Sequence, residues 1–140
     1  MTFDPEYFQL QLATMASEAE TKNGPIQMLN MIRFRDVAEY RNHETPDGPP
    51  LSGREAYATY SAHAGPFVEA VEGALTWVSS DSEVIIGPKD ARWDAVFAVR
   101  YPNRAAFVEM ISNPEYQAIT YHRTAAVADS RLIMMDIAED

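Results

Sequence analysis

Residues 93–101, WDAVFAVRY, decide the fold because their side chains alternate between two faces, as in a half-buried β-strand. One face takes Trp93, Ala95, Phe97, Val99 and Tyr101. A helix is predicted to start after Asn103, and the apolar run RLIMMDI at 131–137 predicts a closing strand. A strand, a helix and a second strand form one half of an α+β sandwich.

The first half of the chain repeats this unit. Residues 26–35, IQMLNMIRFR, predict a strand, and residues 52–55, SGRE, form a capping box that opens a helix. Gly65-Pro66 falls inside this helix and predicts a kink or a short break. Residues 36–50, which lie between the strand and the helix and are rich in proline, predict either a lid or a solvated loop.

The middle and the end of the chain complete the order of elements. Residues 74–87 predict a long strand, bent or bulged around 79–81, which pairs with 93–101 as an antiparallel hairpin. The later helix is predicted to break at Asn113-Pro114 and to restart through Asp129. The resulting order, β-α-β-β-α-β, is the ferredoxin-like arrangement of the α+β class, with a four-stranded antiparallel sheet.

An added N-terminal helix is predicted from Asp4-Pro5-Glu6, which combines a cap, a proline at the first position and an early acid. We therefore expect residues 1–24 to form a helical appendage and residues 25–140 to form the ferredoxin-like domain.

The predicted sheet has helices on one face only, yet the sequence gives it apolar side chains on both faces. These apolar residues are Leu29, Met31, Trp77, Val96 and those of the closing strand. An uncovered apolar sheet face is an association site, and a second copy packed sheet against sheet would cover it. The pattern thus predicts a two-fold homodimer, a dimeric α+β barrel.

The composition excludes several classes of protein. The chain has 140 residues, a formal net charge of −10 and no cysteine. This charge disfavours binding to nucleic acid and to anionic membranes, and no stretch is long enough for a membrane-spanning helix. The first residues, MTFDPEYF, are acidic where a signal peptide is basic, so a cytoplasmic protein is expected.

Three runs of the sequence resemble a known family. They are LNMIRFRDVAEY at 29–40, LSGREAYATYSAH at 51–63, and IIGPKDARWDAVFAVRYPNRAAFVEMISNPEYQAITYHRTAAVADSRLI at 85–133. Together they are similar to the long form of the bacterial family of domains of unknown function numbered 1330. The resemblance implies the dimeric α+β barrel fold and no agreed reaction, because relatives in that superfamily include small monooxygenases, muconolactone-isomerase-like enzymes and stress-response proteins.

Two histidines on predicted helices are candidate catalytic residues, because imidazole exchanges protons near neutral pH. His63 lies near Tyr60 on the first long helix, and His122 precedes Arg123 on the second. Each is also explained as a hydrogen-bonded packing residue, which is the commoner role of a histidine in a helix. His43 lies in the long loop and is a third candidate.

Arginines in an acidic protein can hold a carboxylate through two hydrogen bonds. Arg33, Arg100 and Arg123 are candidates for this role, and salt bridges to neighbouring acids are the alternative. Asn30 interrupts an apolar row. Its amide therefore either ties down a neighbouring strand or faces a polar cavity.

Aromatic side chains could shape a pocket for a flat ligand. The candidates are Tyr57, Tyr60, Trp93, Tyr116 and Tyr121, with packing in the core or the dimer as the alternative. The sequence contains no HxH or HExxH spacing, no Walker loop and no G-x-S-x-G. We therefore predict neither a metal site nor a required cofactor.

Two functions remain open at this point. One is a small dimeric enzyme or binding protein that takes a small organic acid or aromatic metabolite between sheet and helices. The other is a non-catalytic dimeric module that binds a metabolite or a partner protein. The sequence does not choose between them, and it does not name a ligand.

Overall fold

The computed structural model of the chain describes residues 5–41 and 44–138. The strands in this part are β1 (Ile26–Phe34), β2 (Ala74–Val78), β3 (Ala95–Tyr101) and β4 (Val127–Asp136). The helices are α1 (Pro5–Glu18), α2 (Gly53–Ala70), the 3₁₀ turn η2 (Lys89–Ala91), α3 (Arg104–Ser112), α4 (Pro114–Gln117) and α5 (Tyr121–Ala126). Asp4, predicted to cap the first helix, and His43 lie outside the described residues.

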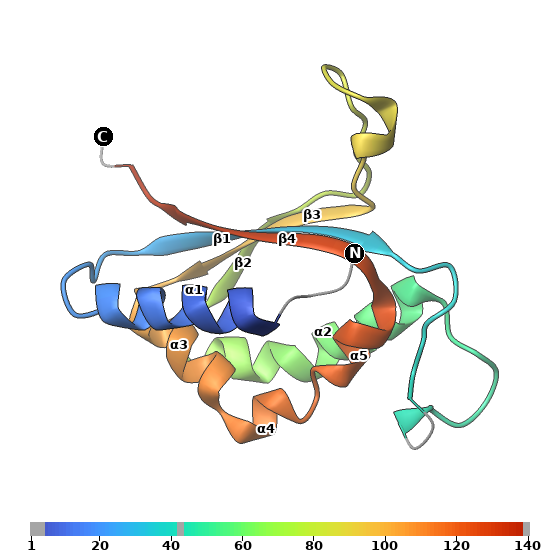
Figure 1. Cartoon of the computed structure of the whole chain (residues 1–140), viewed down its shortest axis with the longest axis horizontal. Coiled ribbons are helices and arrows are strands. Elements are labelled where there is room, and N and C mark those ends of the chain that lie inside the picture. Colours follow the sequence, from blue (N-terminus) through green and yellow to red (C-terminus); the bar gives the residue numbers. More distant parts are fainter. Residues whose placement is uncertain (1–4, 42–43, 139–140) are drawn as a thin grey trace.

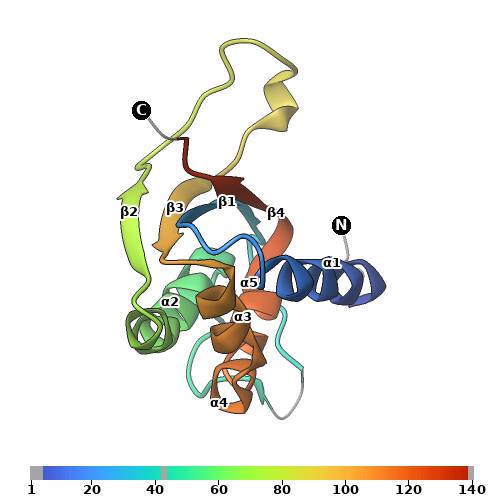
Figure 2. The ribbon, with the colours of Figure 1, turned by 90° about the vertical axis from the view of Figure 1, so that its left-hand side faces the viewer.

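The sheet has the strand order β2-β3-β1-β4, and all neighbouring strands run antiparallel. This order confirms the predicted ferredoxin-like arrangement. Figures 1 and 2 show the helices gathered against one face of the sheet, which we call the inner face. No α-helix of the described chain lies on the opposite, outer side, where the 3₁₀ turn η2 stands away from the sheet.

The core lies between the inner face and the helices. Ile26, Met28 and Ile32 of β1 point inward and are buried. Met15 of α1 belongs to the same buried cluster as Ile26, so the N-terminal helix shares the main core. The division into an appendage and a domain stays a prediction.

A buried arginine connects three of these elements. Arg104 at the start of α3 is 2% exposed. Its guanidinium donates to both carboxylate oxygens of Asp136 at 2.9 and 3.2 Å, and its Nε donates to Glu18 at 3.3 Å. Arg104 therefore joins α3 to the end of β4 and to the last residue of α1.

The closing strand is longer than the sequence predicted. We expected a helix through Asp129 and a strand from Arg131, but α5 ends at Ala126 and β4 begins at Val127. Residues 127–130 lack apolar alternation, so no local pattern marks them as a strand. They are extended because they pair with β1, with a register shift between Arg33 and Phe34.

The hairpin before β3 also differs from its prediction. β2 stops at Val78, and its bulge lies between Leu75 and Trp77 instead of at 79–81. Residues 79–94, which we call the arm, leave the sheet, and β3 starts two residues after Trp93.

Helix α2 starts with the predicted capping box between Ser52 and Glu55. Of the predicted kink or short break at Pro66, the break is wrong, because α2 continues through Pro66 to Ala70. Gly65 helps to explain this, since a residue without Cβ avoids the clash that proline imposes on its predecessor in a helix. The chain then turns at Glu72, whose φ is 63°.

Candidate functional site

Two histidines from different helices meet beside the long loop. His63 of α2 and His122 of α5 stack with ring centroids 5.6 Å apart and an interplanar angle of 13°. Nδ1 of His122 lies 2.7 Å from the hydroxyl of Tyr40, which comes from the loop between β1 and α2. Burial and the charge of His63 lower the pKa of His122, so its imidazole is neutral at pH 7 and shares a hydrogen bond with the Tyr40 hydroxyl.

The neighbouring residue, Arg123, reaches inward. Its Nη2 donates to the hydroxyl of Ser130 at 3.2 Å, and Ser130 lies on the inner face of β4 opposite Ile32. The side chain is partly buried. Within residues 5–41 and 44–138, no carboxylate forms an ion pair with Arg123. A guanidinium in this setting has spare donors for an anion.

Two tyrosines, Tyr57 and Tyr116, lie within the electrostatic influence of this arginine, and Tyr60 contacts both of them. The hydroxyls of Tyr60 and Tyr116 lie 2.6 Å apart, and the rings of Tyr57 and Tyr60 are 5.3 Å apart. Burial raises the pKa values of Tyr57 and Tyr116 above their usual range, and the charge of Arg123 partly offsets this effect. Both phenols therefore stay protonated and can donate hydrogen bonds at neutral pH.

Asn30 belongs to the same side of the sheet. It stands opposite Phe97 of β3 and Leu132 of β4 on the inner face. Its Nδ2 donates to the carbonyl of Met28 at 3.1 Å, so the amide binds its own strand and not a neighbouring one. Leu132 is 43% exposed although it points to the inner face, which means that the helices leave part of this edge uncovered. We use "inner cluster" for Asn30, Tyr57, Tyr60, Tyr116, Arg123 and Ser130.

The remaining sequence-predicted site residues lie elsewhere. Trp93 was expected within a strand as a candidate for an aromatic pocket, but it precedes β3 and stacks with two arginines, Arg33 and Arg131, at 5.3 and 5.4 Å. Arg33 lies on the outer side of β1 and donates to backbone carbonyls of the arm. Arg100 is exposed and pairs in register with Gln27, also on the outer face. The structure thus separates these three residues from the inner cluster.

The long loop between β1 and α2 packs against α5. The backbone N–H of Glu39 donates to the carbonyl of Ala125 at 2.9 Å. A shallow cavity of about 300 Å³ lies within the loop, lined in part by Tyr40, Pro46 and Leu51. No group of three or more His, Asp or Glu that could hold a metal ion occurs within the described ranges.

Sequence reasoning missed Tyr40 and Ser130. Tyr40 lies in a loop without periodicity, and 82 residues separate it from its partner His122. Ser130 falls before the apolar run that marked the closing strand. Neither residue has a local signal in the sequence.

The fold and the inner cluster define a small α+β protein of the ferredoxin-like class. Residues 51–137 match the family described as "Domain of unknown function (DUF1330)". The match covers more than half of the chain, so the protein belongs to this family, and the resemblance seen in the sequence is confirmed. No curated protein matches the chain.

Solved structures similar to this chain are also known. Two crystal structures of the RPA0582 protein, one of them methylated, are 40% and 39% identical to this chain, with TM-scores of 0.81. Each comparison covers 99% of this chain and 94% or 97% of the other. RPA0582 is described as a protein of unknown function from Rhodopseudomonas palustris.

A more distant structure shows the fold alone. It is a protein of unknown function from Bacteroides fragilis, described as dimeric and ferredoxin-like. It is 10% identical with a TM-score of 0.50, over 83% of this chain and 99% of the other. Among the described residues, no helix is both long enough and apolar enough to cross a membrane.

Proposed function

We propose that the protein is a homodimeric binding protein for a small organic acid, with Arg123 as the anchor for the carboxylate. The observation that carries this proposal is the guanidinium of Arg123, which is partly buried yet contacts hydroxyls instead of an acid. A charge in this position is unfavourable unless an anion or several dipoles compensate it. A bound carboxylate would accept two hydrogen bonds from it.

The surroundings of Arg123 suit an acid with an aromatic or apolar body. Tyr60, which is partly buried, offers a ring face, and the buried rings of Tyr57 and Tyr116 pack against it. The exposed inner edge at Leu132 supplies a way in for the ligand. Because each donor comes from a packed helix or strand, the site is preorganised, which limits the entropy lost on binding.

The dimer forms, in this proposal, through the outer face. Exposed apolar side chains gather there, with Trp77 at 50%, Ile133 at 43% and Met135 at 37% exposed. Face-to-face packing of two copies would remove them from water. Sedimentation at micromolar concentration should give twice the monomer mass, and Leu29→Glu at the middle of the face should give a monomer. Val37→Glu, an exposed position off the sheet, is the matched control.

A thermal-shift screen against aliphatic acids, aromatic acids and phenols tests the ligand. An acid at about a hundred times its dissociation constant should stabilise the protein by roughly 2.7 kcal/mol, or several degrees. Arg123→Ala should abolish this shift, and Arg100→Ala on the outer face should keep it. A shift that survives in Arg123→Ala, or no shift with any acid, would contradict the proposal.

A non-catalytic interaction module without a small ligand is the second candidate. It is favoured by two closed hydrogen-bonded pairs, Tyr60 with Tyr116 in the inner cluster and His122 with Tyr40 beside it. In this case a proton transfer by His63 or His122 would have no substrate. The same screen distinguishes the two, since a module of this kind gives a dimer and no ligand shift.

A further inference from the structure

The arm carries the most exposed large apolar side chains in the described chain. It leaves the sheet after Val78 and returns at Ala95. Figures 1 and 2 both show it rising on the side opposite the helices, above the outer face. At its tip, Ile85 is 84% exposed and Ile86 is 95% exposed. Two adjacent isoleucines in water are unfavourable unless something covers them.

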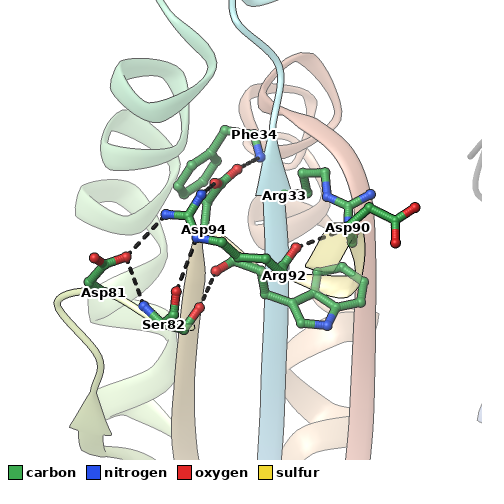
Figure 3. Close-up of polar contacts among 8 residues, drawn as sticks. Arg33, Phe34, Asp81, Ser82, Asp90, Arg92 and Asp94 are labelled. Carbon is green, nitrogen blue, oxygen red and sulfur yellow. Dashed lines mark hydrogen bonds and ion pairs between the residues drawn. The ribbon is translucent and has the colours of Figure 1, made fainter. Parts of the chain in front are cut away.

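The base of the arm is held in place by the sheet. Arg33 of β1 donates to the carbonyls of Asp90 and Arg92, both at 2.9 Å. The ring of Trp93 receives the guanidinium groups of Arg33 and Arg131. Figure 3 shows how the arginine of β1 reaches into the returning limb of the arm.

A second set of contacts joins the two limbs of the arm. Arg92 binds the carboxylate of Asp81 at 3.1 Å, and the hydroxyl of Ser82 donates to the carbonyl of Trp93 (Figure 3). Asp94 accepts the backbone N–H of Phe34 at 2.9 Å. These bonds fix the direction of the arm, so its tip is presented away from its own core.

We propose that the arm clasps the second copy of the chain and buries Ile85 and Ile86 against it. This inference rests on the outer-face dimer proposed above. Packed sheets lie about 10 Å apart, so an arm that rises from the outer face must run alongside the partner. A two-fold axis repeats the contact, and each copy then holds the other. The tip and the apolar outer face point to the same side, which favours one partner for both.

The test compares dimer dissociation constants by sedimentation across a dilution series. In Ile85→Ser/Ile86→Ser, two buried side chains are lost from each arm, and the dissociation constant should rise by about 100-fold or more. Lys89→Ser, an exposed change on the same arm, should leave it unchanged. Ile85, Ile86 and Lys89 are all exposed in the single chain, so circular dichroism should report an intact fold for both variants.

The outcomes separate the two proposals. If the wild-type protein is a dimer and the double-serine variant dissociates with the same constant, the clasp is wrong and the outer-face dimer stands. If the wild-type protein is a monomer at every concentration, the dimer is wrong and the clasp fails with it. If Leu29→Glu and the double-serine variant both weaken a wild-type dimer, both proposals hold.

Discussion

Replacing Gly53 with alanine tests how closely the first turn of α2 packs against the ends of β1 and α5. The N–H of Gly53 donates to the carbonyl of Arg35 at 3.0 Å, and the N–H of Arg35 donates to the carbonyl of Ala126 at 2.9 Å. These two bonds join the first turn of α2, the end of β1 and the end of α5. A Cβ at Gly53 would lie 2.2 Å from the oxygen of Arg35 and 2.7 Å from that of Ala126.

The magnitude follows from these distances. Ordinary contacts of a Cβ begin near 3.4 Å, so the helix must withdraw by about 1 Å, the difference between 3.4 and 2.2 Å. Overpacking of this kind costs about 1–3 kcal/mol, and each weakened hydrogen bond adds about 0.5–1.5 kcal/mol. The higher helix propensity of alanine offsets less than about 1 kcal/mol of this destabilisation. We expect Gly53→Ala to lower the free energy of unfolding by about 2–4 kcal/mol.

Urea unfolding at one fixed protein concentration measures this loss, because a dimer makes apparent stability depend on concentration. Gly24→Ala is the control, since nothing lies within 4 Å of a Cβ placed there. It should be neutral or stabilise by about 0.4–1 kcal/mol through the unfolded chain. If the free energy of unfolding of Gly53→Ala lies within about 0.5 kcal/mol of the wild-type value, the close approach of Gly53 to the Arg35 and Ala126 backbone is not a feature of the fold.

Three further predictions concern buried polar groups. Tyr60→Phe and Tyr116→Phe should each cost about 1–2 kcal/mol in urea unfolding, and the double variant should cost little more than either, because each single change leaves one hydroxyl unpaired. Burial and nearby positive charge lower the pKa of His122 in the folded protein, so on acidification this histidine is protonated in the unfolded chain before it is protonated in the folded one. The free energy of unfolding should therefore fall as the pH drops below about 6.5. His122→Gln should reduce the slope of this decline in pH-dependent melts. Arg104→Met should lower the thermal midpoint by about 3 °C or more, because Asp136 loses its bidentate partner; an unchanged midpoint would contradict the role of this pair.

The order of elements could be predicted because it rests on local signals. Alternation marked β1 and β3, and the capping box at Ser52 marked α2, so each element agrees with its own sequence. The start of β4 and the course of the arm could not be predicted in this way. They depend on contacts between distant residues, such as Arg33 with Asp90, which are 57 positions apart.

The sequence predicted which residues belong to the candidate site better than it predicted how they are arranged. His63 and His122 do meet, and Tyr60 does contact Tyr116, but nothing in the sequence indicated that Tyr40 would bind His122. Contacts between helices depend on how each helix is rotated on the sheet, and a single sequence does not determine that rotation.

Parity along β1 separates the predicted ligand-binding residues into two groups. Asn30 points to the inner face and Arg33, three positions later, points to the outer face, because successive side chains of a strand alternate. A single binding site within one copy of the chain can therefore include Asn30 or Arg33 but not both. Arg123 lies on the side of Asn30, whereas Arg33 donates to the carbonyls of the arm. In the two proposals, ligand binding and clasping of the partner use different faces of one sheet, so Arg33→Ala should weaken the dimer while leaving any shift produced by an acid in place.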